Sequence, residues 1–140
     1  LLNADMIVLG PGSLFTSLIP NLLVPDLAAA VRSSSALKVF ICNVATQPGE
    51  TDNFSCGDHI RALESHVGSG FFDMVISTTR GQVELPDGAQ WVEAEDSLDR
   101  EYAVYRAPIS DPTAAGRHDA DKLAQTLIDI YRERTGPLVA

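Results

Sequence analysis

The chain has 140 residues, of which 45% are hydrophobic and 21% are charged, a composition that excludes a disordered, collagen-like or disulfide-stapled protein and fits one ordinary core. Ten Lys and Arg against 19 Asp and Glu leave a net charge of -9, which disfavours nucleic acids and anionic membrane surfaces as partners. The apolar runs fall far short of the roughly 20 residues that a membrane helix needs, so no transmembrane segment is expected.

The cysteines and the N-terminus bear on the compartment. Cys42 lies in an apolar run and Cys56 in a polar one, without CxxC spacing, which favours free thiols in a reducing compartment over a disulfide. No cationic segment with a cleavage site opens the chain, so no signal peptide is predicted and we expect a cytoplasmic protein. Because the chain starts at Leu1 and reaches a strand almost at once, we also expect it to begin within a larger protein.

The first predicted strand covers residues 4–9 and ends at a glycine loop. Its sequence, ADMIVL, is rich in strand formers, whereas the Gly-Pro-Gly-Ser sequence at residues 10–13 continues neither a strand nor a helix interior. Ser13 can cap the short helix that follows, and we expect Pro20 to interrupt that helix. Pro25 then opens a second helix.

Two more buried strands are predicted, at residues 37–43 and 72–77. The LKVFICN sequence of the first is nearly continuous in apolar character, as expected of a parallel strand that is covered on both faces. The helix between them is expected to start near Ser55, to run to His66 and to end at Gly68. This alternation with short connections predicts right-handed crossovers and a three-layer α/β fold with a parallel sheet.

The remainder of the chain carries weaker signals until its final helix. Its short segments are a turn at residues 86–88, an acidic connection at residues 93–101, and edge strands at residues 90–92 and 103–106. A final helix is predicted from Ala120 to about Glu133, with Asp119 as its N-cap. No internal repeat or linker divides the chain, so we expect one domain or part of one.

The glycine loop is the strongest local signal for a binding site. At the carboxyl end of a buried strand, such a loop can turn backbone N–H groups inward before a helix N-terminus, and Thr16 and Ser17 add hydroxyls. The loop matches neither the dinucleotide-binding glycine pattern nor a P-loop with its lysine. From the residues alone, a phosphate site and a tight structural turn capped by Ser13 both remain open.

A second polar loop follows the second strand at residues 43–52, with the sequence NVATQPGETD. Ligands of open parallel sheets lie outside the carboxyl ends of the strands, so we expect both loops to border one cleft. A polar loop by itself is usually only solvated. The position of this one beside the glycine loop favours contact with a ligand.

A third candidate is Arg117, just before the final helix. Asp119 as the N-cap and Asp121 in the first turn are explained by the helix dipole, whereas Arg117 is not. Arg117 can pair with Asp121 or clamp a phosphate, and the residues alone favour the pairing.

Several other polar residues point to structural roles. Glu93, Glu95 and Asp96 have the pattern of a solvated acidic turn, and Trp91 is most simply a packing residue. Ser13 has no G-x-S-x-G frame, and no zinc-ligand spacing occurs in the sequence. Neither a catalytic residue nor a resident metal is therefore predicted.

Two long motifs carry a resemblance to a known family. They are ADMIVLGPGSLFTSLIPNLL at residues 4–23 and TQPGET at residues 46–51, followed by the pair Asp58-His59. In order and spacing they resemble the CofD/YvcK-like family over residues 4 to about 76. The second motif is similar to the gluconeogenesis-factor branch of that family rather than to its 2-phospho-L-lactate transferase branch.

The resemblance implies a Rossmann-like fold whose loops bind a nucleotide or nucleotide sugar. It also implies that residues 1–140 are the carboxyl-terminal portion of a single α/β domain, without the N-terminal half that carries a further glycine loop. Arg117-His118-Asp119 resembles the Arg-His-Asp sequence of the family, where the arginine is linked to the nucleotide sugar. Ala120 stands where regulated members have a phosphorylated threonine, and residues 78–90 fit the family poorly.

Two functions follow as expectations. The first is a UDP-sugar-binding regulatory protein of the gluconeogenesis-factor type, involved in carbon metabolism and cell-shape maintenance, with no catalytic residue. The alternative is a 2-phospho-L-lactate transferase-like enzyme of deazaflavin coenzyme synthesis with a divalent metal, for which Glu50 and Asp52 are the candidate ligands. A homo-oligomer and an interaction module without ligand stay open. The residues expected at the ligand are Gly10, Gly12, Ser13, Thr16, Ser17, Asn43, Thr46, Gln47, Gly49, Glu50, Thr51 and Arg117.

Overall fold

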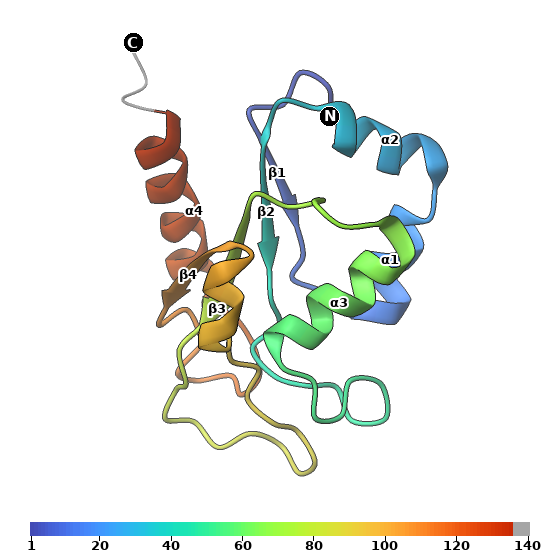
Figure 1. The fold of residues 1–140 in the computed structure, drawn as a ribbon. Coiled ribbons are helices and arrows are strands. Elements are labelled where there is room, and N and C mark those ends of the chain that lie inside the picture. Colours follow the sequence, from blue (N-terminus) through green and yellow to red (C-terminus); the bar gives the residue numbers. More distant parts are fainter. Residues whose placement is uncertain (136–140) are drawn as a thin grey trace.

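A computed structural model describes residues 1–135, and its centre is one parallel sheet (Figure 1). The strands lie in the order β1-β2-β3-β4, with β1 at Met6–Leu9, β2 at Leu37–Ile41, β3 at Met74–Thr78 and β4 at Ala103–Ala107. Each neighbouring pair is parallel. The predicted parallel sheet is therefore confirmed, with 103–106 as an edge strand.

Helices connect the strands and cover both faces of the sheet. They are the π-helical turn η1 at Leu14–Leu18, α1 at Ile19–Leu22, α2 at Pro25–Ser33, α3 at Cys56–Val67, the 3-10 helix η2 at Asp96–Arg100 and α4 at Ala120–Thr135. In Figure 1, α1, α2 and α3 lie on one side of the sheet and α4 on the other. The chain thus forms the predicted three layers.

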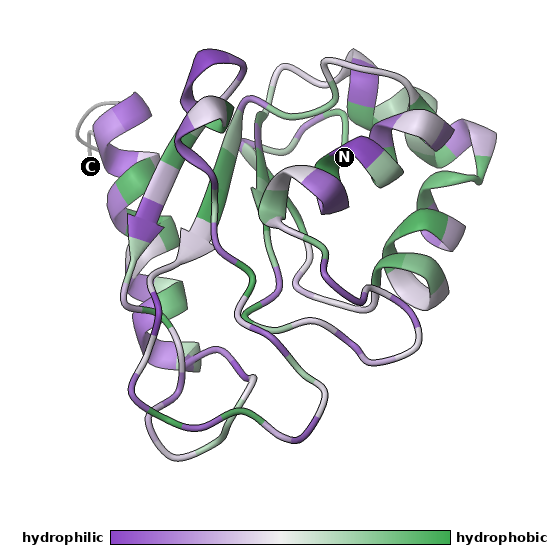
Figure 2. Ribbon diagram, turned by 60° about the horizontal axis from the view of Figure 1, so that its bottom comes forward, coloured by the Kyte–Doolittle hydropathy of each residue, from purple (hydrophilic) through white to green (hydrophobic). Residues whose placement is uncertain are grey.

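Alternate strand residues supply the two halves of the core, because successive side chains of a strand point to opposite faces. Phe40 and Val75 pack with Leu14 and Leu63 from the helices of one face. On the other face, a cluster that includes Val39, Ile41, Ile76 and Ile109 packs against Ile130 of α4. In Figure 2 much of the strand ribbon is hydrophobic, whereas hydrophilic stretches occur along the long loops at one end of the sheet.

The start and end signals of α3 and the start signal of α4 are confirmed. Ser55 is the N-cap of α3 and forms a reciprocal capping box with Asp58, while Gly68 is its C-cap. Asp119 accepts a hydrogen bond from the backbone N–H of Lys122 in the first turn of α4 at 3.1 Å. These caps satisfy backbone donors that the first turn of a helix leaves without partners.

Three local expectations are wrong. Pro20 does not interrupt the first helix, because it lies in the first turn of α1, where a missing N–H costs no hydrogen bond; the break comes at Leu23 and Val24. Residues 90–92 are not an edge strand of the sheet but bridge Ala45 in antiparallel fashion.

The third correction concerns the acidic connection before β4. Glu95 is not merely solvated: its carboxylate accepts hydrogen bonds from the Ser55 hydroxyl at 2.6 Å and from the Gly57 N–H at 3.0 Å. Asp58 accepts further bonds from the Ser55 N–H and from Arg61. Those bonds lower the pKa of Asp58 to about 2. The segment therefore fixes the start of α3.

Two other sequence expectations can be compared with the described residues. Cys42 and Cys56 are both buried and free. Within residues 1–135, no single helix has the length and apolar character to cross a membrane, although the pair Leu14–Leu22 and Pro25–Ser33, bent by 76°, passes by length and composition taken together.

Candidate functional site

The glycine loop crosses the end of β2 at close range. Gly10 has a φ of 88°, and a Cβ atom at this position would lie 2.7 Å from the carbonyl oxygen of Ile41. A side chain would be strained by the backbone conformation and would also collide with the neighbouring strand. The absence of a side chain at Gly10 thus lets the loop lie against the end of β2.

Asn43 fastens this loop from the neighbouring strand. Its Oδ1 accepts a hydrogen bond from the N–H of Gly12 at 3.1 Å, and its Nδ2 donates to the Gly12 carbonyl at 2.9 Å. The Ser13 hydroxyl in turn donates to the carboxylate of Glu50 at 3.0 Å. The two polar loops are therefore bonded to each other at two points, as expected of neighbours at one sheet edge.

Two threonines of the second loop hold the loop itself rather than face solvent. The hydroxyl of Thr46, which is 4% exposed, accepts a hydrogen bond from the N–H of Gln90 at 2.9 Å. The hydroxyl of Thr51, which is fully buried, accepts one from the N–H of Gln47 at 2.9 Å. Buried polar groups with such partners stabilise loop geometry. These two side chains therefore stabilise the second loop from its buried side.

The loops and the segment before α4 border one cavity of about 420 Å³, which we call the glycine-loop cleft. Its lining residues are Pro11, Gly12, Ser13, Asn43, Val44, Ala45, Gln47, Gly116, Arg117 and His118. The expected cleft at the carboxyl edge is thus present. Five of the residues expected at a ligand line it: Gly12, Ser13, Asn43, Gln47 and Arg117. The others lie outside its lining: Gly10, Thr16, Ser17, Thr46, Gly49, Glu50 and Thr51.

Arg117 lines the glycine-loop cleft and does not pair with Asp121, the partner that the sequence favours. Its side chain is exposed and, among residues 1–135, forms neither an ion pair with Asp121 nor any other side-chain bond. Its backbone is fixed, since its N–H donates to Ala114 at 3.2 Å and its carbonyl accepts from the N–H of Asp111 at 2.8 Å. The structure thus leaves an unpaired guanidinium at the cleft, carried by a backbone segment that is fixed.

His118 is a lining residue of the cleft for which the sequence analysis predicts no separate role. Burial lowers the pKa of His118 from its usual 6.5, against the opposing effect of a hydrogen bond with the Cys42 carbonyl, so the ring is neutral at pH 7. Its Nε2 and the Oε1 of Gln47 are buried without hydrogen-bond partners. Such atoms cost about 1–3 kcal/mol each, and because both residues line the glycine-loop cleft, they are candidates for a functional role.

The residues described by the structure supply no metal centre. No group of three or more His, Cys, Asp or Glu side chains within residues 1–135 is arranged to hold an ion. Of the two carboxylates proposed as ligands, Glu50 accepts from Ser13, and Asp52 accepts from the N–H of Gly49 at 2.7 Å. Glu50 is thus engaged with the glycine loop and Asp52 with its own loop.

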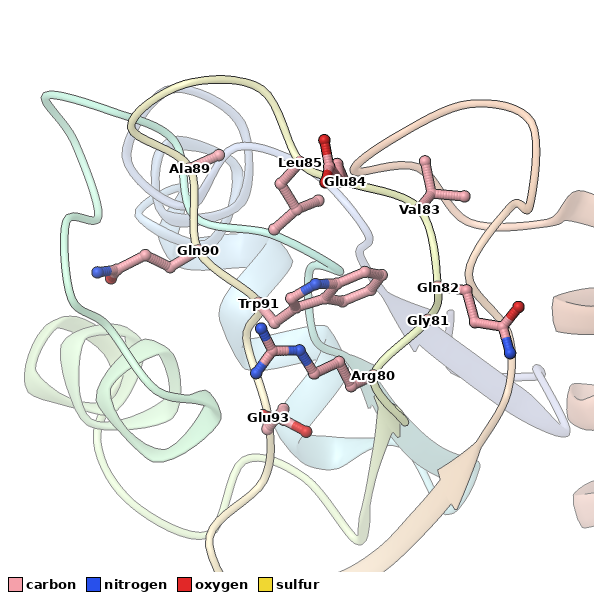
Figure 3. A pocket seen from close by; sticks show the side chains of 10 residues that line it. All are labelled: Arg80, Gly81, Gln82, Val83, Glu84, Leu85, Ala89, Gln90, Trp91 and Glu93. Carbon is pink, nitrogen blue, oxygen red and sulfur yellow. The ribbon is translucent and has the colours of Figure 1, made fainter.

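A second, larger cavity of about 720 Å³ lies along residues 80–93, and we call it the Trp91 cavity (Figure 3). The sequence analysis interprets Trp91 as a packing residue and predicts no binding site in this region. A signal was nevertheless available, since this long connection without a helix or strand carries the one tryptophan of the chain.

Comparison of the sequence with known proteins identifies a family that the chain matches. A family model described as 2-phospho-L-lactate transferase CofD matches residues 1–129. The gluconeogenesis factor of Bacillus subtilis is 37% identical over 94% of this chain and 44% of its own length. The gluconeogenesis factor of Listeria innocua is 44% identical over 90% of this chain and 41% of its own length.

A solved structure gives the same result. An X-ray structure of a protein from Bacillus halodurans superposes with a TM-score of 0.80 at 35% identity, over 91% of this chain and 44% of that one. The chain therefore spans less than half the length of the relatives it matches. The match of the family model over most of the chain, together with these relatives, shows that the chain belongs to the CofD family.

Proposed function

We propose that the glycine-loop cleft contributes to the binding of a UDP-sugar, and that the chain is part of a cytoplasmic regulatory protein of the gluconeogenesis-factor type, acting in carbon metabolism and cell-shape maintenance. The observation that carries the proposal is the meeting of the glycine loop and the unpaired guanidinium of Arg117 in one cavity. The names of the bacterial relatives support the gluconeogenesis-factor type.

The charges of the chain favour a bound anion at this place. In a protein with a net charge of -9, a guanidinium at the cleft that no carboxylate within residues 1–135 neutralises supplies a local positive charge. Its planar set of donors suits the oxygens of a diphosphate, which it can engage with two parallel hydrogen bonds. Asp119 and Asp121 already occupy the positive end of α4, so Arg117 rather than the helix dipole supplies the attraction.

The alternative is the transferase activity that the description of the family model names. That reaction implies a divalent metal to neutralise charge at the moving phosphorus. Glu50 and Asp52 do not fit that role by themselves, because Glu50 is bonded to Ser13 of the glycine loop and Asp52 to Gly49 of its own loop, and no third carboxylate, histidine or cysteine joins them within residues 1–135. We therefore derive no catalytic step for this chain.

Calorimetric titration of the protein with UDP-glucose and with GDP tests the proposal. We expect UDP-glucose to bind more tightly. Arg117→Ala should weaken it roughly 10- to 150-fold, as for the loss of about 1.5–3 kcal/mol of charge-assisted hydrogen bonding. Arg100→Ala is the matched control, since Arg100 is also exposed and has no ion pair within residues 1–135.

Two results would contradict the proposal. If Arg117→Ala leaves the Kd for UDP-glucose unchanged while lowering the melting temperature, Arg117 is a structural residue. If GDP binds more tightly and the protein turns over a phosphoacid with a deazaflavin alcohol, the transferase alternative holds.

A further inference from the structure

We propose that the Trp91 cavity is a second binding site, and that it takes a neutral, hydroxyl-rich ring such as a monosaccharide. The inference does not depend on the glycine-loop cleft, with which this cavity shares no lining residue. Its volume of about 720 Å³ lies within the range of small-molecule sites. It lies on the connection that leaves β3 at its carboxyl end, where ligands of parallel sheets bind.

The backbone that carries the indole is held in place on both sides of Trp91. Residues 90–92 pair with residues 44–46: the N–H of Thr46 donates to the Gln90 carbonyl at 2.9 Å, and the N–H of Val92 donates to the Val44 carbonyl at 3.0 Å. A bridge joins Trp91 itself to Ala45. The platform is therefore tied to the extension of β2 and is preorganised, although it belongs to a loop.

Gly81 packs against one edge of the indole. A Cβ atom at Gly81 would lie 2.8 Å from Cη2 of Trp91 and 2.7 Å from Oγ of Ser110, so no side chain fits between them. The indole as a whole is only half-buried. Figure 3 shows it in the middle of the lining residues, with Glu84 and Leu85 on one side of it and Arg80 and Glu93 on the other.

The polar residues around the indole select the charge of the ligand. Arg80, Glu84 and Glu93 bring one positive and two negative side chains to the cavity, and none of the three side chains has a hydrogen bond or ion pair with another residue of the described part of the chain. A phosphate or nucleotide would meet a net negative lining and would be repelled. A neutral ligand meets no such repulsion.

The same residues select the shape and the groups of that ligand. An indole provides a flat apolar surface for one face of a ring, while a guanidinium donates hydrogen bonds and carboxylates accept them. The amide of Gln82 and the amide oxygen of Gln90, whose Nε2 donates to Asn53 at 3.2 Å, add further hydrogen-bonding groups at the rim. A ring with an apolar face and several hydroxyl groups at its edge uses all of these groups, and a monosaccharide is such a ring.

The single tryptophan makes the site directly observable. Titration of the 140-residue chain with glucose, into the tens of millimolar range, should change the emission of Trp91 in a saturable manner. Glucose 6-phosphate, which carries the same ring with a charged group, should bind at least threefold more weakly. Uridine should produce no saturable change.

Variants connect the signal to the cavity. Glu93→Gln and Arg80→Ala keep the fluorophore and should each weaken glucose binding about tenfold, whereas Arg100→Ala should leave it unchanged. Trp91→Phe retains a ring and should weaken glucose binding about threefold by ligand-observed NMR, with Trp91→Ala losing it. If Trp91→Ala fails to fold, the Glu93 and Arg80 variants still decide the question.

The proposal is overturned by any of three results. One is the absence of a saturable glucose signal in the unmodified chain, and another is a signal that Glu93→Gln and Arg80→Ala both leave unchanged. The third is tighter binding of glucose 6-phosphate or of uridine than of glucose, which would assign the cavity to anions or to nucleobases. Because Arg117→Ala tests the glycine-loop cleft separately, failure of one proposal leaves the other standing.

Discussion

Asn43 offers the most direct test of how the glycine-loop cleft is built. Asn43→Ala removes both hydrogen bonds that join this side chain to Gly12, at 3.1 Å and 2.9 Å. Each such bond contributes about 0.5–1.5 kcal/mol net, and Gly12 is half-buried, so water replaces part of the loss. We expect the free energy of unfolding to fall by about 1–2 kcal/mol, or roughly 3–8 °C in melting temperature for a chain of this size.

A second substitution separates the two bonds. Asn43→Asp keeps an oxygen that can accept from the Gly12 N–H but places a second oxygen against the Gly12 carbonyl, so it should destabilise the chain at least as much as Asn43→Ala. Urea unfolding gives the free energies, and hydrogen exchange at the Gly12 amide reports the loop directly. That amide should exchange faster in Asn43→Ala but stay protected in Asn43→Asp.

The matched control is Asn21→Ala, since Asn21 is exposed and donates one bond to Ser17 within its own helix turn. It should change the unfolding free energy by less than about 0.5 kcal/mol. The reasoning is refuted if Asn43→Ala matches this control in stability and leaves the protection of the Gly12 amide unaltered.

Three further predictions concern the scaffold. Gly10→Ala should destabilise the chain by about 2 kcal/mol or more in urea unfolding, because its Cβ would strike the Ile41 carbonyl; Gly49→Ala, with a φ of 84° but no atom within 4 Å, should cost only about 1 kcal/mol, and equal costs would contradict the collision. Leu63→Ala should cost about 2–5 kcal/mol by the same assay, since this side chain is fully buried. The stabilisation from the lowered pKa of Asp58 should be present above about pH 4 and be lost as the pH falls toward about 2, so Asp58→Asn should flatten that part of the acid-unfolding profile, and an unchanged profile would contradict it.

The order of strands and helices could be predicted because its signals are local. Apolar runs indicate β1, β2 and β3, and Ser55 and Gly68 indicate where α3 starts and ends. Sequence spacing also placed the two polar loops at one edge, because parallel strands all end on the same side. The error at Pro20 arose from position within a helix: the same residue breaks a helix interior and is tolerated in a first turn.

The roles of individual polar residues could not be predicted, because they depend on partners distant in sequence. Thr46 and Gln47 are neighbours in one motif, yet the first bonds to Gln90 from a buried position and the second lines the cleft. The Trp91 cavity depends on a bridge to Ala45, 46 residues earlier, that no local pattern indicates. Arg117 seemed to belong with Asp121 by spacing, but it lies unpaired at the cleft within the described residues.

These roles separate the polar residues of the site by what their loss should change. The side chains of Asn43 and Thr46 form hydrogen bonds with backbone atoms of other segments, so substitution of either residue should alter both stability and cleft geometry. Arg117 makes no side-chain bond within residues 1–135, so its substitution should alter ligand affinity and leave stability nearly unchanged. A cleft whose polar groups are largely engaged in its own construction needs few free groups for its ligand, because preorganised loops lower the entropy lost on binding. If the proposed anionic ligand binds in this cleft, the unpaired guanidinium of Arg117 is the charged group that should orient it against the net charge of -9.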